Sequence, residues 1–129
     1  MAEHGSFIYD SDDYSDDLPF YVNSADRPQL VIPYAFDTND MHYHFGFHRF
    51  VSADDFADYV IETFDQLWDE GAVAPKMMSI GLHLRIIGRP GRIGSLNKMI
   101  AHMQEKGSVW FARRKDIAQH WLETFPPKA

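Results

Sequence analysis

The chain has 129 residues, a net charge of −7 and no cysteine, while 45% of its residues are hydrophobic and 15% are aromatic. This composition predicts a packed core and one domain, or one portion of a larger domain. It excludes disulfides, thiolate metal sites and a cysteine nucleophile, and the acidic balance argues against nucleic acid as the main partner. We also expect no membrane span, because no apolar run approaches roughly 20 residues. Met1 and the residues after it lack the pattern of a secretory signal, so the predicted location is the cytoplasm.

The first third of the chain predicts short extended pieces on either side of an acidic loop. Residues 6–9 are rich in β-forming side chains, residues 18–22 form a brief extended piece, and residues 23–28 are a turn cluster. The acidic residues 10–17 are interpreted as a solvated loop, because they lack the glycine and the terminal glutamate of a calcium loop. Residues 30–34 are apolar on both faces, which is typical of a strand in a covered parallel sheet.

After a long irregular segment over residues 36–50, helices alternate with strands. Ser52 is typical of an N-cap, Gly71 and Gly107 are typical helix stops, and two prolines follow the last helix. The expected elements are a helix over 52–71, a strand over 77–82, a helix from 91 or 92 to 106, a strand over 109–112 and a helix from 115 or 116 to 125. Such alternation implies right-handed crossovers. The predicted fold class is therefore α/β, with three to four parallel strands and three helices.

The stretch from Met77 to Arg92 holds the strongest candidate site. His83 follows a predicted buried strand, and the loops at the carboxyl ends of parallel strands commonly build active sites. An imidazole there can give a proton to a leaving amine as a general acid, although a structural histidine at a strand end is the open alternative. Arg85, Arg89 and Arg92 follow on a loop with glycine and proline. They are predicted to bind a substrate carboxylate, carbonyl or amide, unless they pair with the acidic loop.

Two other predicted strand ends carry possible substrate contacts. Asp37 and Asp40 follow the strand over residues 30–34, and they would reach substrate if that strand end shares a face with His83. Asx residues also form turns, which is the alternative interpretation. Arg113 occupies the matching position after the last predicted strand, so it is a further candidate for substrate binding.

Histidines in the irregular segment offer a less favoured metal site. His42 and His44 are two residues apart, so on an extended backbone they would point the same way and, with His48 nearby, could share a zinc ion. The tract is aromatic and irregular, and it shows no further ligand at a fixed spacing. We therefore predict neither a metal nor another cofactor.

Short motifs in a fixed order extend over nearly the whole chain. They are Tyr9-Asp10-Ser11-Asp12, Asp16-Asp17-Leu18-Pro19-Phe20, Val31-Ile32-Pro33-Tyr34, Asp37-Thr38-Asn39-Asp40, Gly81-Leu82-His83, Gly88-Arg89-Pro90-Gly91-Arg92 and Ala112-Arg113-Arg114-x-Asp116-Ile117-Ala118-x-His120-Trp121. As an ordered set they resemble the carboxyl-terminal half of the polysaccharide deacetylase superfamily. Within it, the chain is most similar to the branch of cofactor-independent allantoinases and peptidoglycan deacetylase-like proteins.

The resemblance implies that residues 1–129 are the carboxyl-terminal part, about half, of a distorted (β/α) barrel. It also implies hydrolysis of a carbon–nitrogen bond, either in N-acetylated amino sugars or in a ureide such as allantoin. Leu82-His83 is similar to the family element whose histidine protonates the leaving nitrogen. In metal-dependent members the aspartate base and the metal ligands come from motifs nearer the amino terminus, and no Thr-Phe-Asp-Asp element occurs in this chain.

A closed barrel of this kind needs about 250 residues, so about half of one would leave sheet edges and an apolar face open to water. We therefore expect a homo-oligomer or a complementary amino-terminal half as partner, besides a small ureide or N-acetylated sugar as substrate. Two functions stay open. One is a portion of a carbon–nitrogen hydrolase that supplies His83 and positioning arginines. The other is a non-catalytic, truncated homologue that acts as an oligomerising binding or assembly module.

Overall fold

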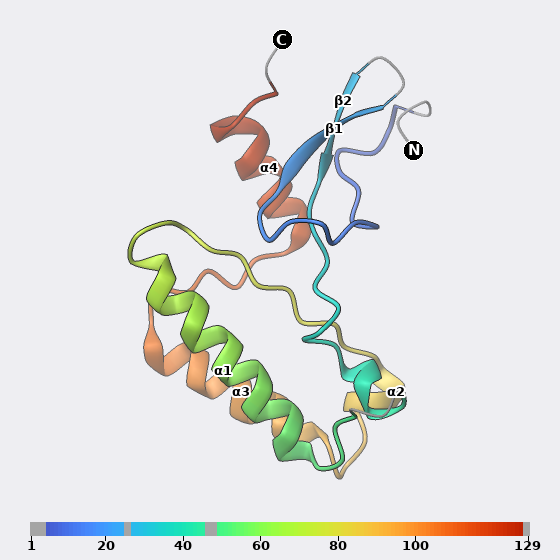
Figure 1. Ribbon diagram of the computed structural model, residues 1–129, viewed down its shortest axis with the longest axis vertical. Helices are drawn as coiled ribbons and strands as arrows, with labels where there is room; N and C mark the ends of the chain where they lie inside the picture. Colours follow the sequence, from blue (N-terminus) through green and yellow to red (C-terminus); the bar gives the residue numbers. More distant parts are fainter. Residues whose placement is uncertain (1–4, 25–26, 46–48, 128–129) are drawn as a thin grey trace. The chain divides into compact units, whose positions relative to one another are not determined.

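The computed structural model describes residues 5–24, 27–45 and 49–127. They divide into two compact units, which Figure 1 shows coloured along the chain. The terminal unit combines Met1–Tyr34 with Trp110–Ala129, and the central unit is Ala35–Val109. Helices and strands are both present, so the α/β class predicted from the sequence is confirmed. Within the described ranges, no helix is both long enough and apolar enough to cross a bilayer.

The terminal unit contains a β-hairpin and a helix. Strands β1 (Phe20–Ser24) and β2 (Arg27–Val31) pair antiparallel, and Phe20 lies opposite Val31. Helix α4 (Arg114–Thr124) is followed by Phe125, whose carbonyl accepts a hydrogen bond of 2.9 Å from the Tyr21 hydroxyl. The apolar end of β2 is buried, so the hairpin contributes a small core of its own.

The strand predictions are partly wrong. Most of the predicted turn over residues 23–28 belongs to β1 and β2, and the predicted strand over 30–34 ends at Val31, two residues before Pro33, which cannot donate to a ladder. Residues 77–82 and 109–112 form no strand, because a strand needs a ladder of bonds to a neighbour. Among the described residues, the one sheet has two antiparallel strands, in place of the three to four parallel strands predicted.

Parallel pairing does occur in the described ranges, at two isolated bridges. Asp10 pairs with Val31 in the terminal unit, and Asn39 pairs with Gly81 in the central unit. The second bridge matters for function, because it aligns two segments that run in the same direction. Their next residues therefore lie at the same end.

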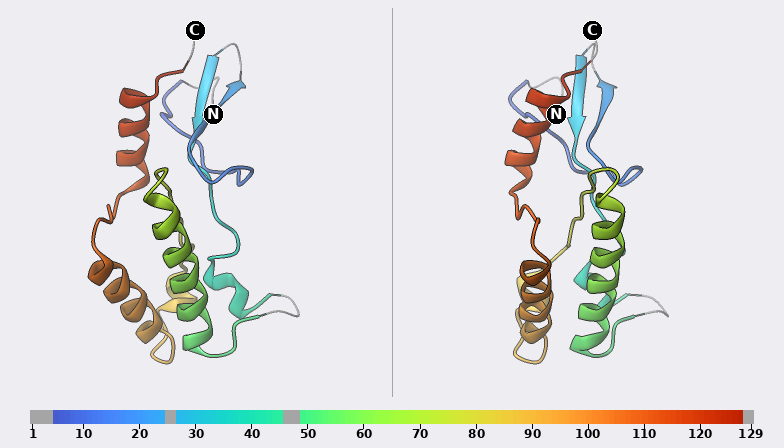
Figure 2. Two further views of the ribbon diagram at one scale, coloured as in Figure 1. Left: turned by 60° about the vertical axis from the view of Figure 1, so that its left-hand side comes forward. Right: turned by 90° about the vertical axis from the view of Figure 1, so that its left-hand side faces the viewer.

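The central unit is built on two long helices that lie side by side (Figures 1 and 2). Helix α1 (Ala53–Gly71) has Ser52 as its N-cap, as predicted. Ser52 and Asp55 also form a capping box, in which each side chain bonds the other residue's backbone amide. Helix α3 (Ile93–Lys106) ends as predicted at Gly107, whose φ of 69° favours glycine. The predicted bounds of α1, α3 and α4 hold to within about two residues.

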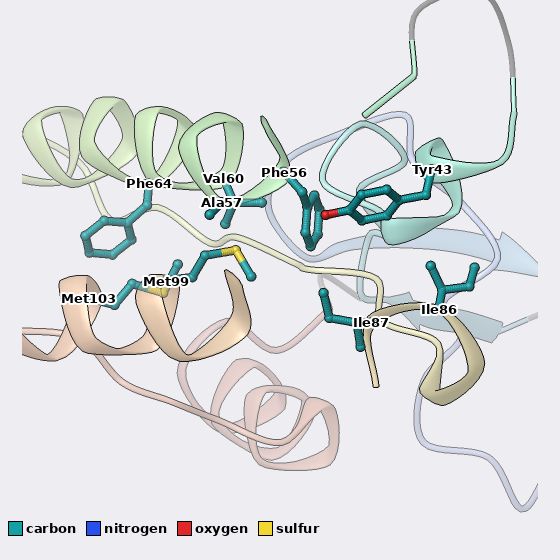
Figure 3. Close-up of a cluster of buried hydrophobic side chains, with 9 residues drawn as sticks. All are labelled: Tyr43, Phe56, Ala57, Val60, Phe64, Ile86, Ile87, Met99 and Met103. Carbon is teal, nitrogen blue, oxygen red and sulfur yellow. The ribbon is translucent and has the colours of Figure 1, made fainter. Parts of the chain in front are cut away.

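The core of the central unit lies between these helices and two short turns of helix. Figure 3 shows Phe64 and Val60 of α1 facing Met99 and Met103 of α3, and all four side chains are buried. The cluster continues to two elements that the sequence did not predict. These are the one-turn helix α2 (Leu84–Ile87) and the 3₁₀ helix η2 (Asp40–Tyr43). Burial of this apolar surface fixes both short elements against α1.

Candidate active site

The parallel bridge in the central unit brings Asp40 and His83 together. The Gly81 amide donates to the Thr38 carbonyl at 2.9 Å, and the Asp40 amide donates to the Gly81 carbonyl at 2.9 Å. His83 stands two residues beyond Gly81 and caps α2. The sequence predicted a substrate contact for Asp40 if its segment ended at the same face as His83. The structure instead places the Asp40 carboxylate in direct contact with the His83 ring.

The Asp40 carboxylate is completely buried and accepts three hydrogen bonds. Its Oδ1 lies 2.6 Å from His83 Nδ1, and its Oδ2 accepts from the backbone amides of His83 (2.8 Å) and Ile87 (3.2 Å). Because a carboxylate only accepts hydrogen bonds, His83 Nδ1 carries the proton in this contact. The side chain is 27% exposed, and its other ring nitrogen, Nε2, makes no hydrogen bond to the described residues.

Buried polar neighbours hold the segment that carries Asp40. Thr38 and Asn39 are each 1% exposed, the Thr38 hydroxyl donates to the Ser79 carbonyl, and the Asn39 side chain accepts from the Met41 amide at 2.9 Å. Throughout the described residues, every buried side-chain nitrogen or oxygen has a hydrogen-bond partner. The carboxylate is therefore fixed from both sides, as a buried charge requires.

The three predicted arginines lie on α2 and the loop that follows it. Arg85 and Arg89 are exposed and form no ion pair or side-chain hydrogen bond with the described residues. The Arg92 guanidinium lies 4.3 Å from the centre of the Tyr43 ring, which is a cation–π contact. Their roles in substrate binding stay predictions.

Asp37 and Arg113 have partners that the sequence did not predict. Asp37 is exposed, and its Oδ2 accepts a hydrogen bond of 3.1 Å from the Tyr59 hydroxyl of α1. In the terminal unit, Arg113 makes a bidentate pair with Asp116, through Nε at 2.7 Å and Nη2 at 2.9 Å. This hydrogen bonding lowers the pKa of Asp116. The sequence placed Tyr59 only at helical spacing, and such spacing carries no signal of a partner at Asp37.

The histidines of the alternative metal site, His42 and His44, form no cluster of metal ligands with other described residues. His42 Nε2 lies 3.1 Å from the Phe36 carbonyl oxygen, His44 is exposed, and His48 lies outside the described residues. Within the described ranges, no group of three histidine or carboxylate side chains is arranged to hold a metal ion.

Comparison with known proteins relates nearly the whole chain to longer proteins. No family model matches it. A curated protein of Schizosaccharomyces pombe, provisionally named a polysaccharide deacetylase, is 43% identical over 131 residues, which are 94% of this chain and 41% of that protein. The chain thus spans about two fifths of the length of this curated relative.

Solved structures give the same relationship. The crystal structure of a provisionally named polysaccharide deacetylase from Pseudomonas aeruginosa PAO1 matches with a TM-score of 0.92 and 49% identity. The Puue allantoinase matches with a TM-score of 0.93 and 48% identity. Each match covers 98% of this chain and 42% of the other. A Mycobacterium smegmatis structure, at 24% identity and a TM-score of 0.77, supports the fold alone.

These similarities agree with the ordered motifs and with the parallel bridge that joins two of them. They extend over almost every residue of the chain and over less than half of each relative. Over nearly all of its length the chain is therefore similar to proteins named polysaccharide deacetylase and to an allantoinase, in agreement with its resemblance to the carboxyl-terminal half of the polysaccharide deacetylase superfamily.

Proposed function

We propose that this chain is the carboxyl-terminal portion of a hydrolase that cleaves a non-peptide carbon–nitrogen bond, with His83 as the general acid. The observation that carries the proposal is the contact of 2.6 Å between His83 Nδ1 and the buried Asp40 carboxylate. The names of the relatives support it, because a deacetylase and an allantoinase both break carbon–nitrogen bonds. The substrate class is therefore a ureide or an N-acetylated sugar.

This geometry indicates which ring nitrogen gives a proton to the leaving group. A leaving nitrogen must gain a proton as its bond to carbon breaks, and a protonated imidazole supplies it from Nε2. Asp40 accepts the hydrogen bond of Nδ1, so Nε2 is the ring nitrogen that can face the leaving group. Asp40 also fixes the orientation of the ring. The group that activates the attacking water is assigned to no residue of this chain.

This mechanism gives Asp40 a role other than the substrate contact predicted from the sequence. Both of its oxygens already accept hydrogen bonds, and the side chain has no exposed surface. A substrate cannot reach this carboxylate without breaking those bonds. We therefore assign Asp40 as a positioning residue that acts through His83.

The remaining site residues keep their predicted roles as parts of the proposal. Arg85 and Arg89 have guanidinium forks that reach solvent near α2, so they suit a substrate carbonyl or carboxylate. Arg92, Asp37 and Arg113 are proposed as further substrate contacts. In this scheme, residues 1–129 form the carboxyl-terminal part of a distorted (β/α) barrel, and its amino-terminal part completes the site.

A second candidate function is a non-catalytic module that binds a partner or a second copy of the chain. It is favoured by the apolar residues on either side of His83, because Leu84 is 92% exposed and Leu82 is 41% exposed. Such surfaces commonly mark interfaces. Sedimentation of the purified chain tests this candidate, which predicts a stable oligomer without hydrolase activity.

The deciding experiment places this chain in a complete enzyme. The matching part of the Puue allantoinase, 48% identical, is replaced by this chain, and the chimera is assayed with allantoin and with N-acetylglucosamine oligomers. We expect the chimera to turn over one of these substrates. The His83→Ala chimera should have a turnover rate about 10²- to 10⁴-fold lower. His102→Ala is the matched control, because His102 also pairs with an aspartate in the central unit. Full activity of the His83→Ala chimera would disprove the assignment.

A further inference from the structure

Four aromatic rings in the central unit join the irregular segment to helix α1. Phe36 and His42 have centroids 5.6 Å apart, His42 and Phe50 are 5.9 Å apart, and Phe50 and Tyr59 are 5.7 Å apart. We call these four residues the aromatic wall. The contacts are edge-on or tilted, which is the favourable geometry for ring pairs. The wall therefore connects the rings of Phe36, His42 and Phe50 to Tyr59 of α1.

Asp37 stands at the edge of this wall with one oxygen bound and one available. Oδ2 accepts from the Tyr59 hydroxyl at 3.1 Å, whereas Oδ1 accepts no hydrogen bond from the described residues. Burial and the bond to Asp37 both raise the pKa of Tyr59, so the phenol stays protonated as a donor. The Tyr59 hydroxyl thus holds Oδ2 of this exposed carboxylate and leaves Oδ1 without a donor among the described residues.

We propose that Asp37 and the exposed parts of Phe36 and Tyr59 form a substrate-recognition subsite, in which Tyr59 positions Asp37. Phe36 is 54% exposed and Tyr59 is 40% exposed. Together they offer apolar ring surface beside a hydrogen-bond acceptor. The inference rests on the proposed function, because it names how the substrate of that same site is held.

The chemistry of the subsite defines its ligand. An anionic acceptor beside aromatic surface fits a small cyclic molecule that is apolar on one face and carries N–H or O–H donors at its edge. A ureide supplies N–H groups and an N-acetylated sugar supplies both kinds of donor. Asp37 lies three residues before Asp40 on the same segment, so recognition and proton transfer share one piece of backbone.

Binding to the 129-residue chain tests the subsite without any need for turnover. Nuclear magnetic resonance follows the Asp37 carboxyl carbon and the Tyr59 ring during titration with allantoin in one arm and N-acetylglucosamine in the other. We expect one ligand to shift both signals. Tyr59→Phe, which keeps the ring, should weaken that binding roughly two- to tenfold, since one orienting hydrogen bond is lost. Asp37→Asn should weaken it further, because the amide replaces an anionic acceptor.

The matched control is Tyr43→Phe, which removes another phenol of the central unit and keeps the ring beneath Arg92. Its affinity should equal that of the unmodified chain. The subsite is overturned if neither ligand moves the Asp37 signal, or if Tyr59→Phe binds as tightly as the control. Its failure is separable from failure of the proposed function. If the chimera shows no turnover but the 129-residue chain binds a ligand through Asp37, only the catalytic role of His83 is contradicted.

Discussion

Two aspartate–histidine pairs in the central unit use the same side chains in different surroundings. Asp40 lies 2.6 Å from His83 Nδ1, and Asp65 lies 2.8 Å from His102 Nε2. The imidazoles are almost equally exposed, at 27% and 29%, whereas the carboxylates differ, at 0% for Asp40 and 35% for Asp65. The surroundings of the carboxylate therefore distinguish the two pairs.

The partners of each carboxylate explain the difference. Asp40 receives two backbone amides besides the imidazole, so its position is set by the chain itself. Asp65 lies on α1 and shares its Oδ1 with Lys106 of α3, 3.1 Å away, so it ties two helices together at the surface. In His83 the free nitrogen is Nε2, far from the backbone, whereas in His102 it is Nδ1. The His83 ring is thus paired with a carboxylate that backbone amides hold in place, whereas the His102 ring is paired with a carboxylate at the surface.

Removing each carboxylate should separate the pairs most clearly. In Asp40→Ala, the amides of His83 and Ile87 lose their acceptor inside the protein. We expect the free energy of unfolding to fall by about 3 kcal/mol. In Asp65→Ala, a partly solvated ion pair is lost, and the expected decrease is below about 1 kcal/mol. Urea denaturation of both variants measures the difference, and equal losses of stability would show that burial of the carboxylate does not distinguish the two pairs.

A subtler change at Asp40 separates stability from catalysis. Asparagine keeps an oxygen that accepts from the two amides, but its amide nitrogen faces His83 Nδ1 and the stabilising negative charge is gone. Asp40→Asn in the chimera should therefore lose at least about tenfold in turnover. Its stability should decrease less than that of Asp40→Ala. Asp65→Asn is the control, and its turnover should match that of the unmodified chimera.

The helices could be predicted from the sequence because their signals are local. Ser52 and Asp55 form a capping box within four residues, and Gly107 stops α3 by its own conformational freedom. The strands could not be predicted as well, because a ladder depends on a distant neighbour. Residues 77–82 have the composition of a buried strand, yet in the described chain only Gly81 of this segment forms a bridge, to Asn39.

The same limit applies to the candidate site. His83 was predicted from an apolar run that ends in a turn-rich loop, which is a local pattern. The function proposed for Asp40 could not be predicted from the sequence, because its hydrogen-bond donors are amides 43 and 47 residues further along the chain. Tyr59 is a similar case, since its partner Asp37 lies 22 residues before it. Residue types at strand ends indicate which groups are present, and tertiary contacts decide what each one does.

The smallest expected effect concerns the pH dependence of the Asp65 pair. The hydrogen bond from His102 is the main cause that lowers the pKa of Asp65 below its ordinary value of 3.8. A lowered folded-state pKa stabilises the protein above the ordinary value, and this stabilisation disappears as the pH falls through the folded value. The unmodified chain should thus exceed Asp65→Asn in stability by less than about 1 kcal/mol near about pH 6, and by less still near about pH 2.5. Urea denaturation at both values tests this, with Asp65→Asn as reference. A difference that does not change with pH would mean that the pair does not link α1 to α3 through charge. The surface pair would then differ from the Asp40 pair in the type of interaction as well as in its contribution to stability.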